Sequence, residues 1–222
     1  MVKPSYISCK ICSGSVRAVR DEQYGHDYYC CDECEFIFLD ESKFISPEQE
    51  KKEYEFHQNS FENEGYVNMF RDFINKAIRP HRSRIRTALD FGSGPGPVLA
   101  ELLRQEGFET EVYDKYFAPE KFYLHKKYDL ITATEVFEHL DAPMGTLRML
   151  KSHLNNDGIL ALMTLFHPND DERFKDWWYR RDATHISFYT PRTFRRMAAL
   201  SGLKVLLSDE KNICVLGGNV RG

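Results

Sequence analysis

Between residues 85 and 216, short apolar runs alternate with stretches in which apolar residues recur at helical spacing. This pattern predicts strands and helices in turn. Short apolar runs predict buried strands at 87–89, within 107–114 and 128–140, and at 159–164, 204–207 and 212–216. Apolar residues at helical spacing predict helices at 66–78, 98–103 and 192–201. Strands that alternate with helices are typical of an α/β protein.

The segment before the first of these strands predicts a further helix. Ser46 is a good N-cap residue and Pro47 suits the first helical position, so a helix is expected to begin there and to continue through 53–57. A break at 63–65 separates it from the helix at 66–78. The aromatic stripe of that second helix is expected to pack against the domain that follows.

Five of the six cysteines lie within the first 34 residues. Cys9 and Cys12 form one Cys-x2-Cys pair and Cys31 and Cys34 form another, at a spacing typical of four-thiolate zinc sites. Each pair presents two soft sulfur ligands to one point, which suits a tetrahedral Zn²⁺. Because four thiolates close the coordination sphere, the zinc is expected to be structural.

Other interpretations of this cysteine module remain open from the sequence alone. Two disulfide bonds are the alternative, although a cytosolic compartment disfavours them. Cys30 can replace Cys31 as the third ligand, but the symmetric spacing favours Cys31, and His26 is a weaker substitute. Gly14 is expected to form the tight turn that aims backbone amides at sulfur. Aromatic and β-branched residues between the pairs predict the short strands of a zinc ribbon.

Composition narrows the class of protein. The 222 residues carry a net charge of −4, and 29% are charged and 42% hydrophobic, which is ordinary for a globular protein. We expect a cytoplasmic protein with no membrane partner, because no apolar run is long enough to span a bilayer and the N-terminus lacks an apolar signal-peptide core. The acidic balance argues against strong non-specific binding of nucleic acid. A basic patch, either a solvated face or a phosphate-binding surface, comprises Arg79, His81, Arg82, Arg84 and Arg86.

The segment 90–96 gives the clearest indication of a ligand site. It reads Asp90-Phe91-Gly92-Ser-Gly94-Pro-Gly96 and joins a predicted strand to a predicted helix. Closely spaced glycines let the backbone approach a ligand, and a helix N-terminus follows them. Asp114 ends the next predicted strand, where a carboxylate can accept both hydroxyls of a ribose.

Four features together resemble the class I S-adenosylmethionine-dependent methyltransferases: the turn at 90–96, Asp114, the strand with its Glu-His motif at 128–140, and the strand that follows Gly158. The resemblance covers about residues 85–216 and implies a Rossmann-like sheet of the seven-strand type. It also implies S-adenosyl-L-methionine as the cofactor, with Asp114 at its ribose. The residues assigned to cofactor binding by the resemblance are Asp90, Phe91, Gly92, Gly94, Gly96, Asp114, Thr134 and Glu135.

The sequence departs from this family after the second strand. Only residues 115–127 are available for a helix and a third strand, so the sheet is expected to be shortened there, with 122–124 as a remnant strand. The acid that usually binds the adenine amino group in the family has no clear counterpart. Tyr116 or Phe117 can cover the adenine ring instead, and core packing is an equal alternative for either residue.

The block at 176–191 is polar and aromatic, a composition typical of a loop built for a site. It resembles a segment of small-molecule methyltransferases that follows the fifth strand. Three histidines, His139, His167 and His185, fall in loops expected at the carboxyl end of the sheet. Candidates for contact with a methyl acceptor are His185 as base or orienting group, then His139, with Tyr189, Trp177 and Trp178 as an aromatic wall.

These features predict three segments: a zinc-ribbon-like module at 1–43, a linker with lid-like helices at 44–82, and a cofactor-binding methyltransferase domain at 83–222. In this class a helix before the first strand often closes over the cofactor, so Tyr66 or Phe70 is a candidate lid residue. The predicted activity is O- or N-methylation of a small molecule. The alternatives are an RNA or protein acceptor held by the zinc module and the basic patch, and a non-catalytic methyltransferase-like scaffold.

Overall fold

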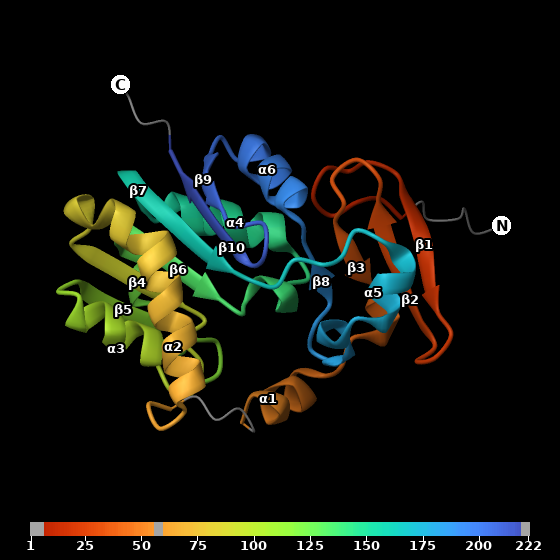
Figure 1. Cartoon of the computed structure of the whole chain (residues 1–222), viewed down its shortest axis with the longest axis horizontal. Coiled ribbons are helices and arrows are strands. Elements are labelled where there is room, and N and C mark those ends of the chain that lie inside the picture. The colour runs from red at the N-terminus through yellow and green to blue at the C-terminus, as the bar shows by residue number, and fades with distance from the viewer. Residues whose placement is uncertain (1–6, 56–59, 219–222) are drawn as a thin grey trace.

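The computed structural model describes residues 7–55 and 60–218, which form two β-sheets and their covering helices (Figure 1). The large sheet has six strands in the order β5-β4-β6-β7-β10-β9. The strands are β4 (Thr87–Phe91), β5 (Glu109–Tyr113), β6 (Tyr128–Thr134), β7 (Leu154–Met163), β9 (Lys204–Ser208) and β10 (Ile213–Gly217). The pairs β4–β5, β4–β6 and β6–β7 are parallel, and β10 is antiparallel to both of its neighbours. The α/β class and the strand positions predicted from the sequence are confirmed.

Successive residues of these strands face opposite layers of helix, as the two-residue period of a strand requires. On one face Ala88, Leu130 and Ala161 pack with α2 (Glu64–Phe73), its continuation at Ile74–Ile78, and α3 (Val98–Gln105). On the other face their neighbours Leu89, Ile131 and Leu162 pack with α4 (Pro143–Ser152) and α6 (Pro191–Leu200). Both faces are covered, so the central strands are apolar throughout.

The connection from β5 to β6 contains no strand, and the prediction of a remnant strand at 122–124 is wrong. Residues Phe122–His125 form a 3₁₀ turn instead. Tyr123 is buried and packs edge-on against Phe91 and Tyr113, which directs this segment over the end of the sheet rather than along its edge. Strand β5 is therefore the edge of the large sheet, one strand short of the seven-strand type. The strand predicted at 159–164 begins earlier than expected, since β7 starts at Leu154.

The small sheet, on the right of Figure 1, joins the N-terminal strands to a later segment of the chain. Its strands are β1 (Val16–Asp21), β2 (His26–Cys31), β3 (Ile37–Leu39) and β8 (Ser187–Phe188), paired antiparallel in that order. Helix α5 (Asp171–Asp176) packs beside it through Phe174, which contacts Tyr28 and Phe188. A buried ion pair of 2.6 Å joins Arg180 Nη1 to Asp21 Oδ2. The small sheet thus takes its fourth strand from the last third of the chain; the division at residues 43 and 82 stays a prediction.

Helix α1 (Pro47–Glu55) begins where the sequence predicts. The Gln49 amide donates to Ser46 Oγ at 3.3 Å, and the Ser46 amide donates to Gln49 Oε1 at 3.1 Å, so the two residues cap the helix reciprocally. The expected continuation to residue 57 lies in part outside the described residues. Short 3₁₀ turns occupy Glu41–Lys43, Arg79–Arg84, Phe137–His139 and Trp178–Arg181.

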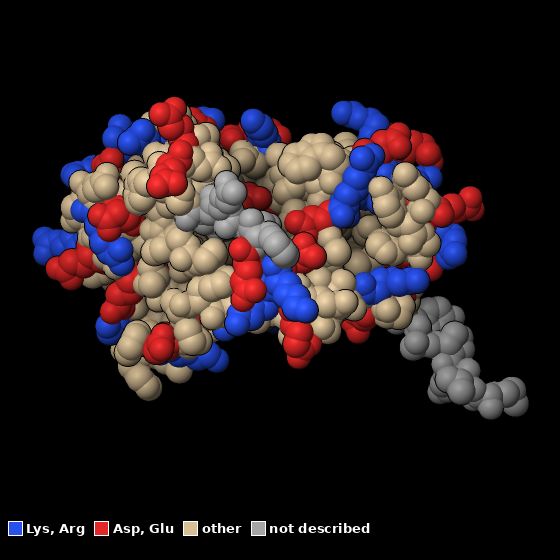
Figure 2. Space-filling model, turned by 90° about the horizontal axis from the view of Figure 1, so that it is seen from below, with Lys and Arg blue, Asp and Glu red and all other residues tan. Residues whose placement is uncertain are grey.

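Helices long and apolar enough to cross a bilayer are absent from the described part of the chain. Basic and acidic side chains are interspersed over the face in Figure 2. The basic patch is partly neutralised within the fold, since Arg79 and Arg82 both contact Glu106, at 2.8 and 3.5 Å.

Candidate functional site

The glycine-rich turn lies where the carboxyl ends of β4 and β5 meet. Gly92 and Gly94 have φ angles of +82° and +65°, a region that favours glycine. A Cβ atom on Gly92 would lie 2.3 Å from Val136 Cγ2, so this position also has no room for a side chain. The Gly92 amide donates to the Tyr113 carbonyl at 2.7 Å, which ties the turn to the end of β5.

Asp114 joins the two turns that follow β4 and β5. Its Oδ2 accepts a hydrogen bond from the Gly94 amide at 2.9 Å. Its Oδ1 accepts from the amides of Tyr116 and Phe117 at 2.8 and 3.1 Å. One carboxylate therefore fixes both loops, and the shape of the glycine-rich turn depends on it.

Asp90 is buried at the end of β4. Its Oδ1 accepts a hydrogen bond from Thr132 Oγ1 at 2.8 Å, on the neighbouring strand β6. Burial raises the pKa of Asp90 to about 6, because the ionised form loses its hydration. A buried carboxylate beside a glycine-rich turn is poised to bind a positively charged or hydrogen-bond-donating ligand.

These residues line a cleft of about 430 Å³ at the carboxyl edge of the large sheet. This is where ligands bind in open α/β sheets. Every predicted cofactor-binding residue lies on the cleft: Asp90, Phe91, Gly92, Gly94, Gly96, Asp114, Thr134 and Glu135. Tyr66, Phe70, Tyr116 and Phe117 line it as well. Segments predicted separately along the chain are thus brought to one cavity.

Of the predicted acceptor-contacting residues, His139, His185 and Trp178 lie on the cleft and Tyr189 does not. Tyr189 is fully buried, its ring packs against Phe36 and Phe194, and its hydroxyl donates to the Phe137 carbonyl at 2.8 Å. It is a core residue, because the chain turns inward at β8 to pair with β3. Trp177 and His167 line a separate, more open hollow beside Glu35.

The polar floor of the cleft is built around Tyr179, which the sequence analysis did not single out. The Tyr179 hydroxyl donates to Glu138 Oε1 at 2.5 Å and lies 3.0 Å from Glu135 Oε2. Burial raises the pKa of both glutamates, most strongly that of the fully enclosed Glu138, where the nearby charge of Glu135 adds to the effect. Glu135 also has a φ angle of +53°, a strained conformation for a residue with a side chain.

The two cleft histidines lie side by side, with ring centroids 4.8 Å apart. His139 Nδ1 is 3.0 Å from the Thr184 carbonyl and His185 Nδ1 is 2.6 Å from the Tyr179 carbonyl. Burial and the neighbouring His185 lower the pKa of His139 to about 3, so His139 is a neutral imidazole at physiological pH.

Helix α1 lines one side of the cleft through Glu50 and Tyr54, two residues that the sequence analysis did not assign to the site. The Glu50 carboxylate accepts from the hydroxyls of Tyr54 and Tyr116, at 2.9 and 2.7 Å, and pairs with Lys115 at 2.7 Å. The Tyr54 ring packs edge-on against His139. The N-cap residue Ser46 predicts where the helix begins, but only the contacts of Glu50 and Tyr54 show that the helix lines the cleft.

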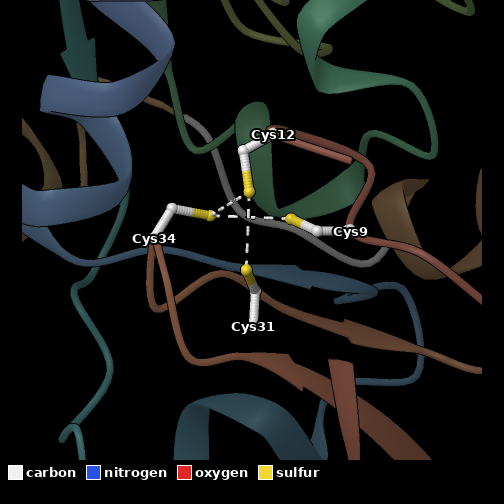
Figure 3. A group of neighbouring side chains, drawn as sticks. All are labelled: Cys9, Cys12, Cys31 and Cys34. Carbon is white, nitrogen blue, oxygen red and sulfur yellow. Dashed lines mark hydrogen bonds between the residues drawn. The ribbon is translucent and has the colours of Figure 1, made fainter. Parts of the chain in front are cut away.

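The second notable site lies in the N-terminal module, where the side chains of Cys9, Cys12, Cys31 and Cys34 converge (Figure 3). Their sulfur atoms all lie within 4.8 Å of one another, with Cys9–Cys34 and Cys12–Cys31 at 3.5 Å. None of the four forms a disulfide bond. The adjacent Cys30 points away, toward the Arg17 guanidinium and a different part of the core. The geometry therefore selects Cys31 over Cys30.

The two cysteine pairs have the same backbone form. In each, the first cysteine carbonyl accepts from the amide four residues later, Ser13 and Glu35 respectively, at 2.9 and 2.8 Å. Those two residues have φ angles of +61°. The turn residue is thus Ser13, and the expectation that Gly14 makes it is wrong; a Cβ on Gly14 would instead meet the Glu33 carboxylate at 2.8 Å.

The second cysteine pair packs against the start of α6. Thr193 Oγ1 donates to the Cys34 carbonyl at 2.8 Å, and Thr190 Oγ1 donates to Glu35 Oε2 at 2.7 Å. His167 Nε2 lies 2.7 Å from the Glu35 carbonyl. Cys9, Cys31 and Cys34 belong to the same apolar cluster as Phe36 and the strands of the large sheet, so the cysteine site is part of the main core.

The fold and cleft agree with the comparisons to known proteins. The chain belongs to the methyltransferase-domain family: the family model described as "Methyltransferase domain" matches residues 27–208. No curated protein matches the chain.

Solved structures of the same fold include an O-methyltransferase family protein from Burkholderia thailandensis, with 13% identity, a TM-score of 0.54, and coverage of 78% of this chain and 64% of that one. Magnesium protoporphyrin IX methyltransferase from Synechocystis PCC 6803, solved with bound SAH, is 14% identical with a TM-score of 0.54, over 78% of this chain and 94% of that one. The chain spans less than two thirds of the Burkholderia protein. At these identities the likeness shows the fold.

Proposed function

We propose that the protein is an S-adenosyl-L-methionine-dependent methyltransferase for a small-molecule acceptor, with a structural Zn²⁺ at its four cysteines. The observation that carries the first part is the glycine-rich turn, held by Asp114 and opening on the cleft at the end of β4 and β5. In this proposal Asp114 binds the ribose, and the Gly92–Gly96 backbone allows close approach of the cofactor. Asp90 suits a positively charged group, and Tyr116 or Phe117 an adenine ring.

S-adenosyl-L-methionine supplies a methyl group on a sulfonium, and the protein's contribution to such a transfer is mainly orientation of the acceptor. The opposite end of the cleft, lined by His139, His185 and Trp178, is the acceptor side. An aromatic and imidazole lining with buried carboxylates beneath it suits a compact molecule that carries an oxygen or nitrogen nucleophile. Related folds include an O-methyltransferase family protein and a methyltransferase of magnesium protoporphyrin IX, which agrees with a small-molecule acceptor.

The test is calorimetric titration of the purified protein with S-adenosylhomocysteine. The wild type is expected to bind in the micromolar range. Gly92→Ala is expected to lose at least about tenfold in affinity, since the new Cβ meets Val136 and strains a left-handed residue. Gly107→Ala is the matched control, because Gly107 also has a positive φ of +91° and lies at the opposite end of the sheet. A Cβ atom there would meet only Arg82 Nη2, at 3.9 Å. No binding by the wild type would refute the assignment.

An RNA acceptor is the second enzymatic candidate, and the non-catalytic scaffold is the third. The pairing of Arg79 and Arg82 with Glu106 leaves the basic patch less charge for phosphate than the sequence indicates. RNA binding that falls steeply with added salt would favour the second candidate. A protein that binds neither S-adenosylhomocysteine nor RNA would favour the scaffold.

The four cysteines fit zinc by a direct geometric criterion. Four sulfurs about 2.3 Å from a tetrahedral Zn²⁺ lie about 3.8 Å from one another. The sulfur–sulfur distances of 3.5 to 3.7 Å among these side chains are close to that value. Four thiolates leave no open position, and the site packs in the core under α6, so its role is to stabilise the fold. The three-segment organisation, with boundaries near residues 43 and 82, is part of the same proposal.

A further inference from the structure

A second group of metal-ligand side chains lies in the cleft, distinct from the four cysteines. One ligand atom from each of Glu138, His139 and His185 lies within 4.8 Å of the others. Glu138 and His139 follow β6, whereas His185 precedes β8, so folding brings them together from segments far apart in the sequence. Two imidazoles and one carboxylate form a donor set that binds divalent transition metals and leaves coordination positions open.

The orientation of both imidazoles is the one expected of metal ligands. His139 and His185 each direct Nδ1 at a backbone carbonyl, of Thr184 and Tyr179 respectively. A ring nitrogen that faces a carbonyl carries the proton, so Nε2 holds the lone pair that a cation requires. Ligating histidines are commonly fixed in this way by a carbonyl or a carboxylate behind them.

Glu138 provides the independent observation. Its side chain is completely buried, and Tyr179 holds only Oε1. Among the described residues, the other oxygen, Oε2, has no hydrogen-bond partner. A buried carboxylate oxygen without a partner has lost its hydration and gained nothing in return, and a bound cation would supply the missing interaction.

The charges around the three side chains also favour a cation. The Glu135 carboxylate shares the Tyr179 hydroxyl with Glu138, and Asp182 Oδ2 lies 3.8 Å from His185 Nε2. The carboxylates of Glu135 and Glu138 thus meet at the Tyr179 hydroxyl, and that of Asp182 lies beside His185. Arg and Lys side chains are not among the described residues that close the floor of the cleft; Lys115, at its rim, is paired with Glu50.

We propose that Glu138, His139 and His185 bind one divalent transition-metal cation, and that this cation coordinates oxygen atoms of the methyl acceptor. The acceptor would then be an oxygen-bearing molecule able to chelate a metal, such as a vicinal diol or a hydroxy acid. The metal would position the acceptor and lower the pKa of a coordinated hydroxyl. The metal site stands on the geometry alone; its use for an acceptor rests on the proposed methyltransferase function. In this arrangement His185 is a ligand rather than a general base.

The probe is Mn²⁺, whose six-line electron paramagnetic resonance signal in solution is lost on binding. Mn²⁺ prefers oxygen and nitrogen ligands to thiolates, so a zinc-loaded protein can be titrated without exchange at the cysteines. We expect one Mn²⁺ per chain. His139→Asn and the nearly isosteric Glu138→Gln are expected to weaken binding by at least about tenfold.

His153→Asn is the matched control, because His153 Nδ1 also faces a backbone carbonyl, that of Lys126 at 3.1 Å, but lies outside the cleft. It should bind Mn²⁺ like the wild type. Circular dichroism verifies that each variant is folded. No Mn²⁺ binding by the wild type, or equal binding by all variants, overturns the proposal. S-adenosylhomocysteine binding without Mn²⁺ binding refutes the metal site alone; Mn²⁺ binding without S-adenosylhomocysteine binding refutes only the methyltransferase assignment.

Discussion

The cysteine pairs and the glycine-rich turn both contain residues at positive φ, but they differ in which residues occupy those positions. Both are tight turns with residues at positive φ, but the cysteine turns place Ser13 and Glu35 there, whereas the other turn uses Gly92 and Gly94. Each cysteine turn sends sulfur atoms inward to a closed centre, packed under α6. The glycine-rich turn has three glycines without side chains and lines the cleft with its backbone. The first site can therefore serve stability, and the second can admit a ligand.

The strongest test of this contrast is removal of one thiolate. Cys31→Ser is expected to lose the proposed zinc and to destabilise the protein by on the order of 5 kcal/mol or more, since metal binding would contribute directly to folding. Cys30→Ser, one residue away, changes a buried thiol that is not directed at the cluster and should keep one zinc per chain. Elemental analysis and thermal unfolding measure both; loss of zinc from Cys30→Ser would reverse the ligand assignment.

The next largest effect is expected at the open site, in Asp114→Asn. An asparagine keeps one acceptor oxygen, so either the Gly94 amide or the Tyr116 and Phe117 amides lose their partner, at about 1–3 kcal/mol. S-adenosylhomocysteine affinity should fall at least about tenfold. Asp129→Asn is the control, because Asp129 also accepts from two backbone amides, at the opposite end of the sheet. If Asp114→Asn were as stable as the wild type and bound S-adenosylhomocysteine equally well, the role given to Asp114 would be contradicted.

Asp90→Asn separates stability from binding at the same site. The pKa of Asp90 is raised from 3.8 to about 6 by burial, so the native state is penalised for ionising it as the pH rises through that interval. The amide side chain of the variant does not ionise and escapes this penalty. The expected gain in unfolding free energy is about 1.5 kcal/mol at pH 5 and about 3 kcal/mol at pH 7, and vanishes below about pH 4.

Ligand affinity should fall in the same variant, because the charge is lost. Chemical denaturation at pH 5 and pH 7, with calorimetry at pH 7, measures the two effects. If Asp90→Asn were less stable than the wild type at pH 7, ionised Asp90 would not destabilise the native state as this prediction requires.

The smallest effect is expected at the cysteine turns, where residues other than glycine have positive φ angles. Ser13→Gly is expected to stabilise the protein by up to about 1 kcal/mol, since glycine has no Cβ to strain. Ser15→Gly, two residues away and not at positive φ, should destabilise it by about 0.5–1 kcal/mol. Thermal unfolding measures both variants. A higher melting temperature for Ser13→Gly and a lower one for Ser15→Gly would support the backbone difference between the two sites, whereas changes of equal sign would contradict it.

The sequence was most informative where the signal is local. Cysteine spacing, the glycine-rich turn and the alternation of 88–89 and 130–131 all depend on near neighbours. They predicted the strands, and the structure brings the four cysteines together and the glycine-rich turn to a cleft. The Ser13 turn was missed because the conformation follows from the cysteine pair and not from the residue type.

Long-range packing explains the remaining errors. Tyr189 lies in a block typical of a site, but β8 pairs with β3 and turns its ring into the core. Tyr179 and Glu50 are unremarkable in the sequence, and only the fold brings them to the cleft, Glu50 through its contacts with Lys115 and Tyr116. The missing third strand was predictable from the length of 115–127; its replacement by a 3₁₀ turn follows from the burial of Tyr123.

The pairing of β8 with β3 has a consequence for synthesis of the chain. The paired residues Ile37 and Phe188 lie far apart in the sequence. Thr190 and Thr193, which contact the second cysteine pair, come as late as Phe188. All four thiols leave the ribosome before any of this cover exists. Contacts so distant in sequence form slowly, so the four thiols stay accessible to metal ions and to oxidants until the last third of the chain has folded.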